Sequence, residues 1–323
     1  MRKLVSIVLT AACVTFFNFK GIAQEVDINK GIELQNQALE AYEAKQYDQA
    51  IQYGNEAYKI AAEAGEEGAD VKANMEKLIP QAYLGKANNL VIEKQYENAI
   101  AAFNEAKTVA DKYNAESVKE NIAEAFPKVY MAMGKDSYDA NDFDAAVTSL
   151  TKAVELDPNN SQVYLMLGAA YMKKGDMDGA EQSFAKCAET ATTAGNEAVA
   201  KNANTQLSNV YLMKASAASK AKKWSDMLTF ADKSLAANES LNGYKLKAGA
   251  AAQLKRWDAV IEAYDKVVSM GKESDKPTAY YNIAVAYQEK NNTTKACEFY
   301  KKLTNDKTYK AHAEQAITAL KCK

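Results

Sequence analysis

The sequence predicts an all-α protein built as an array of helical hairpins, and three observations predict this class. Alanine, lysine, glutamate, glutamine and leucine dominate long stretches, whereas 14 glycines and 4 prolines in 323 residues are too few for the turns of an all-β protein. The chain resembles itself at intervals of 33 to 49 residues. Glycine or asparagine, which favour the left-handed conformation that closes a helix, recurs at one position of the longer units.

Composition also bounds the function. With 48% apolar residues, 25% charged residues and a net charge of −2, the chain can bury a core and is not a disordered segment. Its one histidine is His312, and Arg256 is the only arginine beyond residue 2. Acid–base catalysis, His-rich metal sites and bidentate phosphate recognition therefore lack their usual residues. We expect no enzyme, no metal, no cofactor and no nucleic-acid partner; the remaining enzymatic alternative would use paired carboxylates.

Residues 1–23 have the three parts of a secretory signal peptide. Arg2 and Lys3 form a basic start, residues 4–19 are mostly apolar, and residues 21–23 offer small side chains for cleavage. A membrane-spanning helix needs about 20 apolar residues, which is more than this run contains. We therefore expect cleavage after Ala23 and a periplasmic or secreted chain without an integral membrane segment.

A second interpretation of the same segment is a lipid anchor at Cys13. Residues 10–13 are similar to a bacterial lipobox, although Thr10 stands where leucine is usual and apolar residues follow the cysteine. Lipidation would make the protein an outer-membrane-associated component, for example of barrel assembly or of glycan capture. The mass of the N-terminus distinguishes this alternative from a chain that begins at Gln24.

The clearest repeated unit is a helix–turn–helix pattern with a period of 34 residues. It comprises Tyr164, Leu167, Gly168, Tyr171, Ala180, Phe184 and Cys187, and it is preceded by Tyr130, Met133, Gly134, Tyr138, Phe143, Ala146, Leu150, Ala153 and Pro158. This pattern resembles the signature of the tetratricopeptide repeat family, and the resemblance covers residues 29–307. It implies a right-handed α-solenoid of about seven hairpins, in which small residues let two helices approach and large ones fill the gap.

The register divides residues 24–307 into seven units. An aromatic residue ends the turn within most units, and small residues follow three and ten positions later. Met227 and Val260 depart from the small-residue pattern, which weakens the case for a close helix approach in those two units. The predicted units lie near residues 31–64, 80–113, 127–160, 161–194, 208–240, 241–274 and 277–307.

Three units are longer than the others, and their extra residues begin at Gly65, Asn114 and Gly195. These residues predict that the second helix of each unit runs one turn longer and closes there. The segments that follow contain no glycine and predict a longer first helix in the next unit. They are residues 70–79, 117–126 and 197–207.

The prolines mark helix positions. Pro80 and Pro127 fall inside the lengthened first helices, where each predicts either a kink or a separate short helix. Pro277 falls at the start of a helix, where its missing N–H costs nothing.

Residues 308–323 are predicted as a capping helix that covers the end of the array. Polar residues occupy one face, and we expect His312 to be a surface or capping residue and not a ligand. The apolar face consists of Tyr309, Ala313, Ala316, Ile317 and Leu320.

Three cysteines follow the leader, an odd number that excludes a complete disulfide framework. Cys187 occupies a small position between helices, so we expect it to be buried as a small hydrophobic residue. Cys297 and Cys322 could meet if their helices are antiparallel neighbours. Because the two lie at unequal distances from the intervening loop at residues 305–307, we expect free thiols.

The resemblance also implies where a partner binds. In the family, the first helices of the repeats form a concave face that receives extended peptides or partner helices, which implies a non-catalytic scaffold for protein–protein interaction. Leu165 and Ala169 replace the lysine and asparagine with which some relatives hold a C-terminal carboxylate, so that subclass is disfavoured. The methionines fit either a tolerant apolar groove or the core. The matching positions are Met131, Lys135, Leu165, Met166, Ala169, Met172, Tyr281, Asn282 and Gln288.

Charge is unevenly distributed along the chain. Residues 25–70 contain 11 acidic residues and 3 lysines, whereas residues 201–256 contain 10 basic residues and 3 acidic ones. These stretches are either solvated helix faces or surfaces for a polar partner or for head-to-tail association. Neither the partner nor the oligomeric state follows from the sequence.

Overall fold

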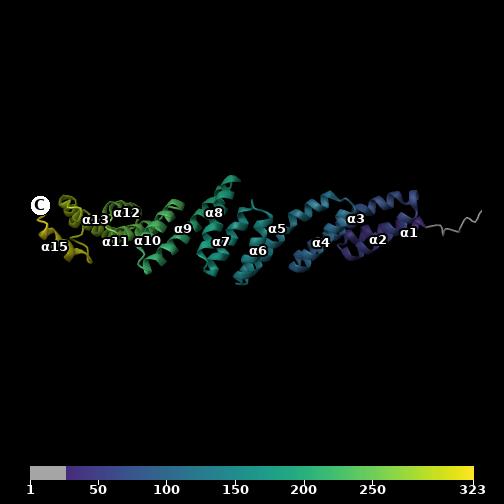
Figure 1. Ribbon diagram of the computed structural model, residues 1–323, viewed down its shortest axis with the longest axis horizontal. Coiled ribbons are helices and arrows are strands. Elements are labelled where there is room, and N and C mark those ends of the chain that lie inside the picture. Colours follow the sequence, from purple (N-terminus) through teal and green to yellow (C-terminus); the bar gives the residue numbers. More distant parts are fainter. Residues whose placement is uncertain (1–26) are drawn as a thin grey trace, which may run out of the picture. The chain divides into compact units, whose positions relative to one another are not determined.

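The structure, a computed structural model, describes residues 27–323, so the predicted leader and Cys13 lie outside the described residues. The described residues form fifteen α-helices, two short 3-10 helices and no strand (Figure 1). The α-helices are α1 (Ile28–Glu43), α2 (Tyr47–Glu63), α3 (Ala69–Ile92), α4 (Tyr96–Lys112), α5 (Glu116–Asp139), α6 (Phe143–Leu156), α7 (Ser161–Lys174), α8 (Met177–Thr193), α9 (Glu197–Lys220), α10 (Trp224–Ala237), α11 (Leu241–Gln253), α12 (Trp257–Met270), α13 (Lys276–Glu289), α14 (Thr293–Lys301) and α15 (Lys310–Ala319), and the 3-10 helices are η1 (Gly65–Gly68) and η2 (Glu273–Asp275).

The helices form seven consecutive hairpins, α1/α2 to α13/α14, followed by α15, which confirms the predicted fold class. The chain divides within α5 into two compact units, residues 27–122 and residues 123–323. Successive helices pack against each other within each unit. Because the turn within each hairpin has only two or three residues, the two helices of a hairpin are antiparallel neighbours.

The turn within every hairpin has the same backbone geometry. In the first hairpin, Lys45 has a φ of 59°, and the N–H of Gln46 donates to the carbonyl of Ala41 at 2.8 Å. This left-handed residue closes the first helix and aims the chain into the second. The left-handed positions of the seven turns are Lys45, Lys94, Asn141, Gly175, Lys222, Lys255 and Asn291.

The longer units have the predicted geometry. Gly65, Asn114 and Gly195 have φ values of 66°, 52° and 70°, and each follows a second helix of 17 residues. The second helices α6, α10 and α12 have 14 residues. The first helices that follow the long ones, α3, α5 and α9, have 24 residues each.

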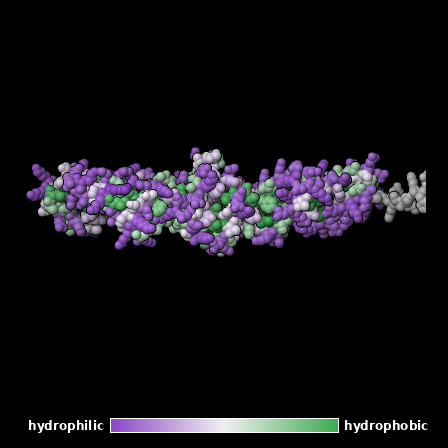
Figure 2. Space-filling view, viewed as in Figure 1, coloured by the Kyte–Doolittle hydropathy of each residue, from purple (hydrophilic) through white to green (hydrophobic). Residues whose placement is uncertain are grey.

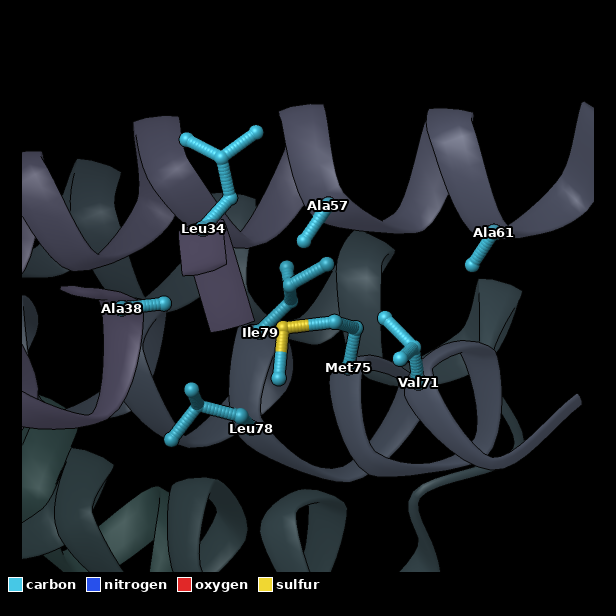
Figure 3. Packing of buried hydrophobic residues seen from close by; sticks show 8 residues of the cluster. All are labelled: Leu34, Ala38, Ala57, Ala61, Val71, Met75, Leu78 and Ile79. Carbon is cyan, nitrogen blue, oxygen red and sulfur yellow. The ribbon is translucent and has the colours of Figure 1, made fainter. Parts of the chain in front are cut away.

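In the first unit, the lengthening of two neighbouring helices is coupled by packing. Val71, Met75 and Ile79 lie in the added part of α3, and they pack on Ala57 and Ala61 of α2 (Figure 3). All five side chains are buried. The extra turn of α2 therefore exposes no apolar face, because the extra turns of α3 cover it.

The prolines differ partly from expectation. Pro80 lies inside α3 and Pro127 inside α5 without a break in either helix, so the alternative of a separate short helix is wrong. Each proline removes one main-chain hydrogen bond, but Leu78, Ile79 and Pro80 are buried, and their packing favours one continuous helix. Pro277 lies in the first turn of α13, as predicted.

Small residues close the hairpins as predicted. Ala50, Ala146 and Ala180 at the first small position are fully buried. Met227 is also buried, and its Cε lies near Gly249 of α11, where an added Cβ would be 3.7 Å away. Phe184 is 1% exposed and thus fills the space between helices, as the hairpin pattern requires.

The surface is mostly hydrophilic, with small hydrophobic patches on the face shown in Figure 2. In the described part of the chain, no helix combines the length and the apolar character that crossing a bilayer requires. Within residues 27–323, the exposed large apolar side chains are Ile32, Leu39, Ile92, Leu156, Met213 and Met270.

The expectation of free thiols at Cys297 and Cys322 is wrong, because the structure joins them in a disulfide with a Cα–Cα distance of 5.6 Å. Irregular turns occupy residues 302–309 between α14 and α15 and lengthen the segment that leads away from Cys297. Lys321, with a φ of 51°, then turns the chain after α15. The segment from Cys297 to the point where the chain reverses and the segment from there to Cys322 thus become comparable in length. The disulfide fixes the capping helix α15 to α14.

Candidate binding groove

The second unit contains a groove of about 510 Å³ between the first helices of three successive hairpins. Leu165, Ala169 and Met172 come from one face of α7, since they are spaced by four and three residues. The other lining residues come from α5, α8 and α9 and from the end of α7: Tyr138, Lys173, Phe184, Asn202, Gln206 and Met213.

The floor of the groove is apolar. Leu165, Ala169 and Met172 are half-buried and pack against Phe184, which is almost fully buried. Met213 on α9 is 46% exposed at the opposite wall. Methionine is unbranched and polarizable, so Met172 and Met213 can adapt to apolar side chains of different shapes.

Polar side chains lie beside this floor. Asn202 and Gln206 are one helical turn apart on α9, and the Gln206 Nε2 donates to the Asn202 Oδ1 at 3.4 Å. Because that bond is long and each amide offers both donors and an acceptor, the two side chains can also pair with the main chain of a ligand. The exposed Lys173 adds a charged group, and Tyr138 also lines the groove.

The lengthened helix α9 builds this polar wall. Asn202 and Gln206 belong to its added N-terminal part, so the insertion contributes directly to the groove. An ion-pair network holds α9 on α8: the Lys214 Nζ lies 2.6 Å from a carboxylate oxygen of Asp178 and also bonds to Glu181. The hydroxyl of Tyr211 donates to Glu181 at 2.9 Å.

The network keeps its charges. Burial alone would raise the pKa of Glu181, but the hydrogen bonds from Lys214 and Tyr211 outweigh it and hold the pKa below its ordinary value. Burial and the Glu181 carboxylate together raise the pKa of Tyr211 to about 12. Glu181 is therefore ionised and Tyr211 neutral over the physiological range, and the wall formed by α9 stays attached.

Three of the nine predicted binding residues line the groove: Leu165, Ala169 and Met172. Met131 and Met166 are half-buried against a neighbouring core cluster, so they contribute to the packing of the second unit. Lys135 is exposed and pairs with Asp139 at 2.5 Å.

The predicted residues of the seventh hairpin lie apart from this groove and bond within their own region. Tyr281 stacks on Tyr309 with a centroid distance of 4.8 Å, which places its ring under the capping segment. The Asn282 side chain donates to the Thr278 carbonyl at 2.7 Å. The Tyr300 hydroxyl donates to Gln288 at 2.9 Å.

Five groove residues were not predicted from the sequence: Tyr138, Lys173, Asn202, Gln206 and Met213. A signal was present, because Asn202, Gln206 and Met213 lie on the first helix of the fifth hairpin, which belongs to the predicted concave face. The rule that first helices form this face identifies the helix but not the groove position of Asn202 and Gln206, because the repeat register assigns no position to the insertion.

Reactive groups have structural roles elsewhere. Cys187 is fully buried, its Sγ donates to the Ser161 carbonyl at 3.1 Å, and burial raises its pKa to about 11. His312 is exposed and lies edge-on to Tyr281. Among the described residues, no three His, Cys, Asp or Glu side chains gather in a way that could hold a metal ion.

Stacked antiparallel hairpins with a groove along their first helices define an α-helical repeat protein. Comparison with family models identifies the repeat: the tetratricopeptide repeat model matches residues 80–113, 161–192 and 277–305, and a TPR repeat model matches residues 134–175. The chain therefore contains tetratricopeptide repeats. It is 36% identical over 69 residues to a TPR repeat-containing protein of Pseudomonas aeruginosa, an alignment that spans 21% of this chain and 66% of that protein.

Several solved structures are similar in fold. MamA is 24% identical with a TM-score of 0.37, covering 58% of this chain and 94% of the other. YrrB, described as a TPR protein with an unusual peptide-binding site, is 20% identical with a TM-score of 0.36, covering 62% and 97%. The TPR domain of P58(IPK) is 13% identical with a TM-score of 0.30, covering 91% and 97%. Similarity at this level carries no information about partners.

Proposed function

We propose that the protein is an exported, non-catalytic scaffold that binds a protein segment in the groove of its second unit. The tetratricopeptide repeats support a role in protein–protein interaction. The observation that carries the proposal is the groove itself, in which the apolar floor of Leu165, Ala169 and Met172 faces the amide side chains of Asn202 and Gln206.

The groove favours an extended internal segment with one large apolar side chain. Its volume of about 510 Å³ is in the range of ligand pockets, and Met172 and Met213 can repack around different apolar groups. The amides of Asn202 and Gln206 are placed to pair with main-chain groups. Leu165 and Ala169 offer only apolar contact at the two positions where some relatives hold a terminal carboxylate.

A pair of methionine variants tests the groove. Met213→Glu places a carboxylate at its wall, and Met270→Glu makes the same change on α12 outside it; the two methionines are 46% and 45% exposed. Peptides selected from a random displayed library on the wild type are measured by fluorescence anisotropy against both variants. We expect Met213→Glu to weaken binding by about tenfold or more, because the apolar contact is lost, and Met270→Glu to leave it unchanged. Equal affinities for Met213→Glu and the wild type would refute the groove as the binding site.

Export is supported by the predicted leader and by the disulfide between Cys297 and Cys322, since disulfides persist in oxidising compartments. The test is expression of the full chain in a Gram-negative bacterium, followed by fractionation and intact mass measurement. We expect a periplasmic chain that begins at Gln24. A cytoplasmic chain that keeps its leader would contradict export, and a lipidated Cys13 would establish the membrane-anchored alternative instead.

A further inference from the structure

Two neighbouring hairpins of the second unit carry a basic edge that the groove does not use. It lies at the turn between α9 and α10 and at the turn between α11 and α12. The two turns are on the same side of the stack, because α9 contacts α11 and the intervening α10 is antiparallel to both. Five exposed residues form this basic edge: Lys220, Lys222, Lys223, Lys255 and Arg256.

The basic edge is not neutralised within the described part of the chain, where none of its five residues forms an ion pair. Other basic residues of the same region bond to carboxylates: Lys214 to Asp178, Lys233 to Glu181, Lys245 to Asp275 and Lys247 to Asp232. These four lysines on helix faces are thus paired, whereas the five cations of the basic edge are not.

Two of these cations occupy positions where they cost stability. Lys223 and Arg256 are the N-cap residues of α10 and α12, and neither makes a side-chain capping bond. At the equivalent position of other hairpins, Asp142 and Asp176 accept hydrogen bonds from the first turn of the helix. A cation at a helix N-terminus provides no acceptor and opposes the helix dipole. Gln46 and Gln95 also lack a capping bond at this position, so the distinguishing feature of Lys223 and Arg256 is the positive charge that each places at a helix N-terminus.

Neighbouring residues do not cancel the positive charge. Asp226 and Asp258 lie in the first turns of α10 and α12, and Asp258 already bonds to Lys290. The five cations of the basic edge therefore outnumber the nearby carboxylates. Because the whole chain has a net charge of −2, an anionic partner would be attracted to this edge and not to the protein in general.

Acidic protein is a better match to this edge than a membrane is. Membrane-surface binding combines cations with apolar side chains that insert into the bilayer. Trp224 and Trp257 flank the basic residues, but both are half-buried in hydrophobic clusters. None of the large exposed apolar side chains of the described residues lies in these turns. Arg256 offers a planar guanidinium, which binds a carboxylate through two hydrogen bonds.

We propose that the basic edge binds an acidic segment of a partner protein, independently of the groove. The carboxylates of such a segment would neutralise Lys222 and Lys223 at one turn and Lys255 and Arg256 at the next. They would also supply the negative charge that the N-termini of α10 and α12 lack.

The test replaces both capping cations with the residue used by other hairpins. Binding of labelled poly-L-glutamate to the full chain is measured at low and high salt for the wild type and for Lys223→Asp/Arg256→Asp. We expect the double variant to bind about tenfold more weakly, since two attractive contacts become repulsive, and the affinity of the wild type to fall as salt rises. The variant should unfold at the same or a higher temperature, because aspartate restores the helix caps.

Lys59→Asp/Lys107→Asp is the control, since both lysines are exposed on other helices and the net charge changes equally. We expect it to change the affinity by less than about twofold. The proposal is overturned if the wild type does not bind poly-L-glutamate, if the capping variant binds like the wild type, or if the control weakens binding equally. Binding to vesicles that contain phosphatidylglycerol, without binding to poly-L-glutamate, would identify a membrane surface instead.

Discussion

Gly168 lies at a close contact between α7 and α8, and Gly168→Ala tests whether this approach fixes the hairpin. An added methyl group would lie 2.7 Å from two carbons of the Phe184 ring and 2.9 Å from a third. Phe184 is 1% exposed, so its ring has little space to move into. Overpacking costs about 1–3 kcal/mol, while alanine regains about 1 kcal/mol of helix propensity. With three ring carbons in collision, we expect the free energy of unfolding to fall by about 1–2 kcal/mol.

Gly249 provides a matched control in α11. A methyl group there would lie 3.7 Å from the Met227 Cε, which is an ordinary contact. Gly249→Ala should therefore raise the free energy of unfolding by about 0.5–1 kcal/mol. Urea unfolding followed by far-ultraviolet circular dichroism measures both variants against the wild type. If Gly168→Ala is as stable as the wild type, or if both variants shift in the same direction, the close approach of α7 and α8 does not determine the hairpin.

Three further perturbations have defined outcomes. Cys297→Ser removes the disulfide between two cysteines that are 25 residues apart in the sequence. Because the unfolded chain is then less restrained, the free energy of unfolding should fall by about 3.5 kcal/mol. The amides of α15 should lose hydrogen-exchange protection, while those of α1 keep it. Burial raises the pKa of the Cys187 thiol from 9.0 to about 11. The contribution of the neutral thiol to the stability of the folded state is therefore complete below pH 9 and is lost as the pH rises to 11. Urea titrations should show this loss of about 2–3 kcal/mol in the wild type but not in Cys187→Ala. Asn114 has a φ of 52°, so Asn114→Ala should lower the free energy of unfolding by about 1 kcal/mol and Asn114→Gly should not; equal losses would contradict a left-handed residue there.

The helix boundaries were predictable because they depend on local chemistry. Gly65, Asn114 and Gly195 close helices since their backbones reach the left-handed region at low cost, and this property is visible in the sequence alone. The buried alanines at the small positions follow from the same repeat register. The sequence therefore predicts the hairpins and even the extra turns of the longer helices.

The disulfide could not be predicted in this way. The distance between Cys297 and Cys322 depends on the path of residues 302–309, which form irregular turns and follow no repeat register. Counting residues from an assumed loop gave arms of unequal length. Only the actual path of these turns shows that the two sulfur atoms meet.

The groove was predictable in part. Leu165, Ala169 and Met172 follow directly from the register of a first helix. Asn202 and Gln206 lie in the added part of α9, to which the register assigns no position. Their place in the groove depends on the contact between α9 and α7, which is a property of the folded unit.

The turns within hairpins are nearly constant, and the length differences lie in the helices and connections between one turn and the next. The turns within hairpins have two or three residues and one backbone geometry, whereas the connections between hairpins differ in length and content. A Cβ added to Gly65 or Gly195 would meet no atom within 4 Å, so the chain there borders open solvent. An epitope tag, a fluorophore or a second domain is therefore best grafted beside these two glycines, where natural length changes have already been absorbed.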